Sequence, residues 1–333
     1  MDIMKLKERL VETIEKTEKE LNKENEWITT YEKRADTILQ NKKIKEDLSK
    51  KFYKRKPFTY YENITRINQY ATKLIVSVRY LGQEVAEITV TDKSNGDNVT
   101  ISTAKYEESN RDNFKCPITL DDVSWNKDIK AKEFRKFFRE RENFRFNNNK
   151  ENEEHRIESA LLTEFLKTKS EEKLLCGIQP VTFAGFRFPM PTAVTASKTI
   201  KLGGNKGKKG GGIDILARTK GKKLTVFELK DENKESENIS KVLEQSTAYA
   251  VFLINLLRSK CGQKWYKIME FNGAIPKSLT IRVCGAMPLK QDGSYEKFET
   301  FKIKYKNDIL EYHWLYFEED DREIKNIKTS INK

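Results

Sequence analysis

The 333-residue chain has only two histidines and four scattered cysteines, none of them in a Cys-x-x-Cys pair. A metal site built from several histidines is therefore excluded, and neither a zinc ribbon nor a disulfide framework is suggested. No apolar run approaches the roughly 18 residues that a membrane-spanning helix needs. The first residues also lack the apolar segment of a secretory signal. These absences favour a cytoplasmic protein that does not bind membranes.

Basic residues outnumber acidic residues by 64 to 51, which gives a net charge of +13. This balance is typical of proteins that bind nucleic acid, although a lysine-rich surface also serves solubility. The excess is concentrated between residues 196 and 223, where Asp214 is the single acidic residue. The nine basic residues there are Lys198, Lys201, Lys206, Lys208, Lys209, Arg218, Lys220, Lys222 and Lys223. The pattern predicts a phosphate-binding segment that reserves one carboxylate for another task.

Residues 1–50 are predicted to be helical, because apolar residues recur at helical spacing among Lys and Glu, without proline or glycine. A single mixed-charge helix and a helical hairpin both fit this pattern. Such a helix either packs on its own domain or binds a partner, which is another protein or a second copy of the chain. A structural or interaction protein organised by this helix is therefore one hypothesis for the function.

Two further elements are predicted before residue 150. β-Branched residues and an Asn-Gly turn favour a small antiparallel sheet over about 70–106. Residues 127–146 are predicted to form a basic helix whose phenylalanines either fill a core or stack on nucleobases. The asparagines that follow break this helix. We therefore predict an N-terminal α+β accessory region, 1–150, and a second domain, 151–333.

The second domain alternates predicted helices and strands. Helices are expected at 153–169 and about 236–259, and strands at 178–230, 278–286 and 299–317. A helix that connects strands in this way indicates a layered α/β domain with a mixed sheet.

A glycine-rich segment precedes Asp214, since six of the ten residues at 203–212 are glycine and three are lysine. Main-chain amides without side-chain bulk suit close approach to a phosphate backbone, whereas a solvated loop without a ligand is the alternative. It is not a Walker loop, because Lys208 is followed by Lys209 rather than Ser or Thr. The candidate nucleic-acid contacts are Lys198, Lys201, Lys206, Lys208, Lys209 and Arg218.

The segment 213–230 is predicted to form a β-hairpin closed by a glycine-containing turn. Alternation along its second strand points Glu228 and Lys230 to the same face. The hairpin can bring Asp214 beside Glu228, although the sequence leaves the register open. Two carboxylates offer hard oxygen ligands to Mg²⁺, and a nearby lysine can hold the attacking water or stabilise phosphate charge. A plain salt bridge between Glu228 and Lys230 is the alternative.

Two helices carry further candidates. Glu158 lies on or beside an apolar helix face, where a carboxylate is costly unless it is paired or metal-bound. Gln245 and Tyr249 lie one turn apart and can hydrogen-bond phosphate or orient a carboxylate. The ordinary alternatives are a glutamate at the rim of the core and a core helix with a buried tyrosine.

Four elements of the sequence, taken in order, resemble the motifs of the PD-(D/E)xK nuclease superfamily. They are Glu158, Gly212-Ile213-Asp214, Glu228-Leu229-Lys230 and Gln245-xxx-Tyr249. The Gln-xxx-Tyr element is similar to that of its RecB-like branch. The resemblance covers residues 153–260, with Ile213 in place of the proline that names the family. It implies an α/β fold with a restriction-endonuclease-like mixed sheet flanked by helices.

The resemblance also implies metal-dependent hydrolysis of phosphodiester bonds, of DNA in preference to RNA, that leaves 5′-phosphate ends. Asp214 and Glu228, with the Leu229 carbonyl oxygen, would bind Mg²⁺ or Mn²⁺, and Lys230 would position or deprotonate the attacking water. Glu158 would support the metal or its water, and Gln245 and Tyr249 would orient the site and hold the nucleic-acid strand. The alternative is a catalytically silent protein that keeps the fold and binds or regulates nucleic acid.

Overall fold

The structure is a computed structural model, and by contacts the chain divides into two compact units. One comprises Met1–Glu32 and Ile157–Lys333, and the other Lys33–Arg156. The described residues are 2–23, 26–40, 57–62, 73–80, 83–91, 99–103, 114–140, 157–158, 160–162, 164–165, 177–181, 188–191, 212–219, 223–230, 238–290, 292–320 and 323–331. No helix within these ranges is long and apolar enough to cross a membrane.

The unit Lys33–Arg156 contains a five-stranded antiparallel sheet with its strands in chain order. The strands are β1 (Thr59–Glu62), β2 (Lys73–Tyr80), β3 (Gln83–Thr91), β4 (Val99–Ser102) and β5 (Val123–Ser124). The antiparallel sheet predicted at about 70–106 is therefore confirmed, and β1 and β5 extend it. The turn expected between β3 and β4 lies outside the described residues.

Helix α5 (Ile129–Arg139) occupies the middle of the predicted basic helix, and Asp128 caps its N-terminus. Its Phe134 and Phe138 are fully buried, and their rings contact Phe58 at centroid distances of 5.7 and 5.2 Å. The guanidinium of Arg135 lies 4.4 Å from the centre of the Trp125 ring. Phe134 and Phe138 thus fill a core in this unit, whereas Phe137 is only partly buried and Phe144 and Phe146 lie outside the described residues. The predicted domain boundary after this helix lies outside the described residues.

The other unit is built on a seven-stranded mixed sheet in the order β12-β13-β11-β10-β9-β6, with β14 also paired to β13. Its strands are β6 (Ile178–Pro180), β9 (Ile215–Thr219), β10 (Leu224–Leu229), β11 (Thr280–Pro288), β12 (Phe301–Tyr305), β13 (Asp308–Asp320) and β14 (Glu323–Thr329). β11 is parallel to both β10 and β13, and the other neighbours are antiparallel. The fold is therefore mixed α/β, as the sequence predicts.

Helix α7 (Ile239–Arg258) is the crossover that makes β10 and β11 parallel, and it packs on both strands. Asn238 caps its N-terminus by accepting a hydrogen bond from the Ser240 amide at 2.9 Å. Because its residues are largely apolar, α7 is buried between the sheet and a second helical layer. The elements of this unit that accompany it are α1 (Ile3–Lys23), α8 (Gly262–Ile268) and the part of α2 (Glu26–Gln40) that ends at Glu32.

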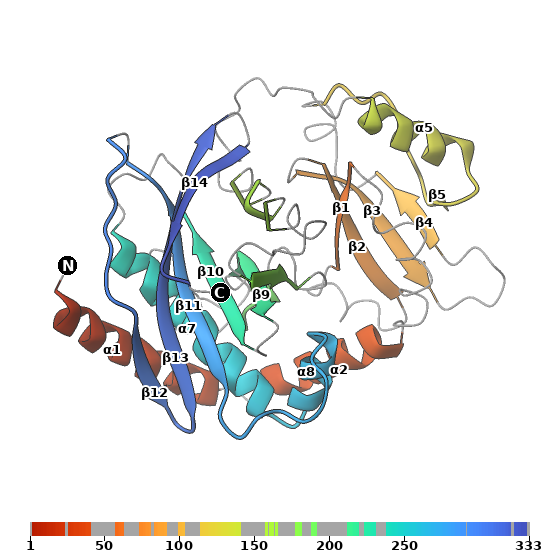
Figure 1. Ribbon diagram of the computed structural model, residues 1–333. Helices are drawn as coiled ribbons and strands as arrows, with labels where there is room; N and C mark the ends of the chain where they lie inside the picture. Colours follow the sequence, from red (N-terminus) through yellow and green to blue (C-terminus); the bar gives the residue numbers. More distant parts are fainter. Residues whose placement is uncertain are drawn as a thin grey trace. The chain divides into compact units, whose positions relative to one another are not determined.

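Helix α1 lies along α7 (Figure 1). Arg9 pairs with Glu244 of α7 at 3.5 Å, and the ring of Tyr31 in α2 lies 5.1 Å from that of Phe252. Residues 1–32 therefore group with the C-terminal unit rather than with the predicted N-terminal accessory region, 1–150. The physical reason is that periodicity reveals an apolar helix face but not which distant surface covers it.

Candidate active site

Asp214 stands at a bend where the main chain changes its pairing partner. Before it, β8 (Gly212–Ile213) pairs with the short strand β7 (Phe188–Pro189), and after it β9 pairs with β10. The register of β9 and β10 places Ile215 opposite Phe227. The carboxylate of Asp214 consequently reaches the second strand, where its Oδ2 accepts a hydrogen bond from the Leu229 amide at 2.8 Å.

Glu228 lies in β10 and Lys230 directly follows the strand, and the two side chains contact one another, as their alternation predicts. The Lys230 Nζ donates a hydrogen bond to Glu228 Oε1 at 2.9 Å. Asp214, Glu228 and Lys230 are each no more than 6% exposed. The structure therefore brings together Asp214, Glu228, Leu229 and Lys230, and it does so at the carboxyl end of β10 in the interior of the protein.

The face that Glu228 occupies is the one covered by α7. Glu228 lies opposite Gly285 of β11, and a Cβ atom on Gly285 would stand 2.5 Å from Ile239 Cδ1. Glycine at this position lets the first turn of α7 approach the sheet beside Glu228. On the other face, Phe227 packs against Phe165 at a ring-centroid distance of 5.5 Å.

Burial makes this group of charges costly unless they compensate one another or a cation joins them. Two carboxylates and one ammonium sum to a charge of −1. Hard carboxylate and carbonyl oxygens with a net negative charge are the ligand set that Mg²⁺ accepts, with water completing its coordination. The donor set around Asp214 and Glu228 therefore fits a divalent ion.

Glu158 is fully buried, in the helical segment that also carries Phe165. This segment packs against Phe227, on the face of β10 that points away from Glu228. Within the described ranges, no three or more His, Cys, Asp or Glu side chains form a group that could hold a metal ion. Glu158 thus does not complete a three-carboxylate set with Asp214 and Glu228, and its supporting role remains a prediction.

Gln245 and Tyr249 both lie on α7, Gln245 partly buried and Tyr249 only 4% exposed. Gln245 follows Val242, whose Cγ1 lies over Gly285, by one helical turn. With a rise of about 1.5 Å per residue, Tyr249 is roughly 10 Å beyond Val242 along the helix axis. Gln245 is therefore nearer than Tyr249 to the part of α7 that faces Glu228.

Of the candidate nucleic-acid contacts, only Arg218 falls among the described residues, and it is strongly bonded within the fold. Its Nη1 donates to the Glu270 carbonyl oxygen at 2.6 Å, and its Nη2 to Glu270 Oε2 at 2.7 Å and Gln179 Oε1 at 3.1 Å. A phosphate contact by Arg218 would have to replace these bonds. The five lysines at 198, 201, 206, 208 and 209 lie outside the described residues.

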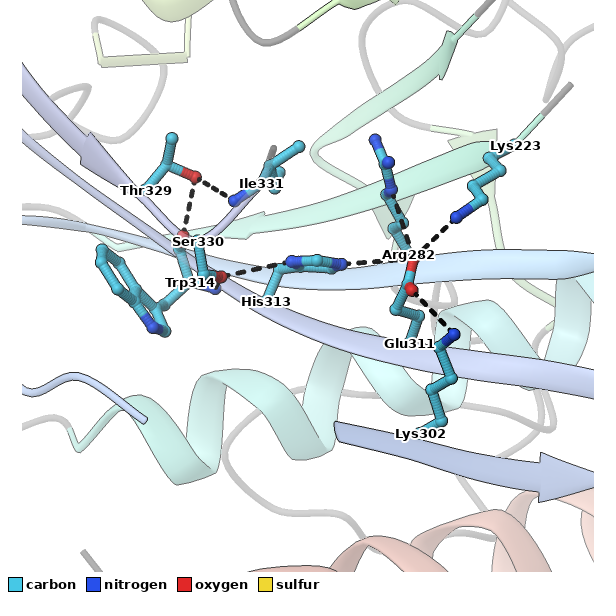
Figure 2. A network of polar contacts seen from close by, with 9 residues as sticks. All are labelled: Lys223, Arg282, Lys302, Glu311, His313, Trp314, Thr329, Ser330 and Ile331. Carbon is cyan, nitrogen blue, oxygen red and sulfur yellow. Dashed lines mark hydrogen bonds and ion pairs between the residues drawn. The ribbon is translucent and has the colours of Figure 1, made fainter. Parts of the chain in front are cut away.

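A second polar network, which no sequence pattern predicts, is centred on Glu311 of β13 (Figure 2). Lys223 Nζ, Arg282 Nε and His313 Nε2 lie 3.1, 3.4 and 3.4 Å from Glu311 Oε2, and Lys302 Nζ lies 3.5 Å from Oε1. Burial by itself would raise the pKa of Glu311, but Lys223 and His313 outweigh it and hold the pKa at about 2. The residues of this network come from distant segments of the chain, so no local sequence pattern predicts that they meet.

The same network fixes His313. Burial lowers the pKa of this imidazole more than the neighbouring Glu311 raises it. Its Nδ1 lies 3.2 Å from Ser330 Oγ, which also accepts a hydrogen bond from the Trp314 amide at 3.0 Å. These bonds tie the C-terminal end of the described chain to β13, which is a structural role.

No protein-family model, curated protein or solved structure matches this chain. The resemblance to PD-(D/E)xK nucleases accordingly rests on the residues and contacts described above.

Proposed function

We propose that this protein is a metal-dependent nuclease that hydrolyses phosphodiester bonds, of DNA in preference to RNA. One observation carries the proposal, the convergence of buried Asp214, Glu228 and Lys230 around Leu229 at a strand end. A surface salt bridge would explain the contact between Glu228 and Lys230. It does not explain why a second carboxylate, from the bend between β8 and β9, is buried against the same stretch of main chain.

The secondary structure of these segments also supports the proposal. Glu158 lies in a helical segment, Asp214 at a bend, Glu228 in β10 with Lys230 directly after it, and Gln245 and Tyr249 in α7, which are the elements that the resemblance implies. The net charge of +13 adds a general attraction for a polyanionic substrate.

In the proposed site, Asp214 and Glu228 hold the divalent ion, and the Leu229 amide orients Asp214 through its hydrogen bond. When bound, the ion polarises a phosphoryl oxygen and lowers the pKa of a coordinated water. Lys230 compensates one carboxylate charge through its contact with Glu228. The same ammonium positions the attacking water and donates a hydrogen bond to the phosphate as charge develops there.

The test is incubation of the purified chain with circular and linear DNA and RNA, in the presence of Mg²⁺, Mn²⁺ or EDTA. Cleavage should require the metal, leave 5′-phosphates that a ligase accepts, and disappear in Asp214→Asn and Glu228→Gln. Glu15→Gln, at an exposed glutamate of α1 in the same unit, is the matched control and should retain full activity. Binding of DNA without cleavage by any metal would refute the proposal and favour the catalytically silent alternative.

A further inference from the structure

The parallel strands connect the proposed active site to an aromatic cluster on the same face of the sheet. The register places Glu228 opposite Gly285, and Gly285 opposite Trp314. Residues paired between parallel strands project to the same face, so Trp314 shares the face of Glu228. The first turn of α7 packs over Gly285 and so covers the middle of this row of residues.

The next row towards the carboxyl ends of the strands begins at Lys230. The Lys230 amide donates to the Ala286 carbonyl oxygen at 3.1 Å, so Lys230 falls beside Met287, and Met287 lies opposite Tyr316. Neighbouring strands are about 4.8 Å apart, and β11 lies between β10 and β13, so the main chain at Tyr316 is about 10 Å from that at Lys230. This distance is within the reach of a nucleotide that neighbours the scissile phosphate.

A third aromatic ring reaches this cluster from the segment before β12. The ring centroid of Tyr295 lies 5.4 Å from that of Trp314 and 5.2 Å from that of Tyr316. The same segment is tied to the sheet, because Trp314 Nε1 donates to the Phe298 carbonyl oxygen at 2.9 Å and Tyr316 Oη to that of Glu296 at 2.8 Å. Tyr295 therefore rests on a fixed base.

Exposure distinguishes the supporting rings from those that can meet a ligand. Trp314 and Tyr316 are buried, at 9% and 4% exposure, whereas Tyr295 and Met287 are only partly buried. The Tyr295 ring is held on Trp314 and Tyr316, and Met287 is paired with Tyr316 on the same face of the sheet. Aromatic rings and thioethers are flat or polarisable groups. Such surfaces bind nucleobases by stacking, with little dependence on the base.

We propose that Tyr295 and Met287 form a stacking subsite for an unpaired nucleobase adjacent to the scissile phosphate. The inference rests on the proposed function, because that function identifies nucleic acid as the ligand. In a duplex both faces of each base are already stacked, so the subsite selects a single strand or an unpaired end. The segment 290–299 around Tyr295 carries three acidic residues, Asp292, Glu296 and Glu299, and two lysines, Lys290 and Lys297. Its net charge of −1 does not attract a polyanion, so affinity here comes from stacking rather than from charge.

Binding in EDTA tests the subsite without any need for cleavage. Fluorescence anisotropy of a labelled oligothymidylate should show about 5- to 150-fold weaker binding to Tyr295→Ala, the range that loss of one stacked base produces. Tyr295→Phe keeps the ring and should bind as the wild type does. The slope of affinity against salt concentration should be unchanged in Tyr295→Ala, because no phosphate contact is removed. Equal loss for single strands and duplexes would overturn the proposal.

A second measurement uses only the wild-type chain and so does not depend on the folding of a variant. A single abasic position is moved along an otherwise uniform oligonucleotide, and one position should weaken binding while its neighbours do not. A flat profile would overturn the subsite. If abasic scanning and Tyr295→Ala both show the effect but no metal supports cleavage, the subsite stands and the nuclease proposal fails. If cleavage requires a metal but the abasic profile is flat, the nuclease proposal stands and the subsite fails.

Discussion

Replacement of Glu311 by glutamine should expose how one carboxylate holds four strands of the sheet together. Lys223 precedes β10, and Arg282, Lys302 and His313 belong to β11, β12 and β13. Glutamine keeps the size of the side chain but removes its negative charge. Arg282, whose side chain is only 12% exposed, then loses its counterion, and the two lysines repel it and each other.

The size of the effect follows from the pKa of Glu311, which the fold lowers from 4.5 to about 2. A shift of this size has an upper limit of about 3 kcal/mol of stability at neutral pH. Lys302 is 62% exposed and Lys223 35%, so solvent screening reduces the expected contribution to about 1–2 kcal/mol. The pKa is lower in the folded state, so the contribution is complete above about pH 4.5 and disappears as the pH falls towards 2.

The assay is urea denaturation of the wild type and Glu311→Gln at pH 7, 5, 4 and 3. The variant should be less stable by about 1–2 kcal/mol at pH 7 and 5, and the difference should shrink steadily at pH 4 and 3. Glu299→Gln, at an exposed carboxylate, is the control and should show no such convergence. A deficit that stays constant from pH 7 to 3 would refute the electrostatic account, because it would have to arise from packing or hydrogen-bond geometry.

Three further predictions concern the proposed active site. Lys230→Met should reduce cleavage at least 100-fold, the usual scale for loss of a group that stabilises developing charge. Its metal affinity, measured by calorimetry, should be nearly unchanged, and loss of metal binding would show that Lys230 organises the ligands instead. Gly285→Ala should cost about 1–3 kcal/mol in urea denaturation, because its Cβ meets Ile239 Cδ1, and Ile239→Val, which removes that atom, should restore part of it. The triple variant Lys206→Ala, Lys208→Ala and Lys209→Ala neutralises three lysines of the glycine-rich segment before Asp214. It should bind DNA more weakly and with a flatter salt dependence, and an unchanged salt slope would contradict a phosphate contact there.

Local features of the sequence predict local features of the site. The common direction of Glu228 and Lys230 needs only the two-residue period of a strand, and it appears as a 2.9 Å contact. The Glu311 network is different, because it joins positions 223, 282, 302, 311 and 313 across four strands. Its members become neighbours only through strand order, which the α7 crossover and the β12–β13 hairpin decide. The packing of α1 on α7 is unpredictable for the same reason.

The position of Asp214 shows which part of the site the sequence does not predict, namely the register of β9 against β10. β10 is buried along its whole length on both faces, so hydrophobic alternation cannot choose its register against β9. The register is set instead by the hydrogen bond that the Thr219 amide donates to the Lys223 carbonyl oxygen at 2.9 Å, and by the pairing of β9 with β6. A slip of one residue would turn the β9 side chains to opposite faces and carry Asp214 away from the Leu229 amide. The chemistry proposed for Asp214, Glu228 and Lys230 therefore depends on pairing at Thr219 and Lys223, at the opposite end of the β9–β10 hairpin.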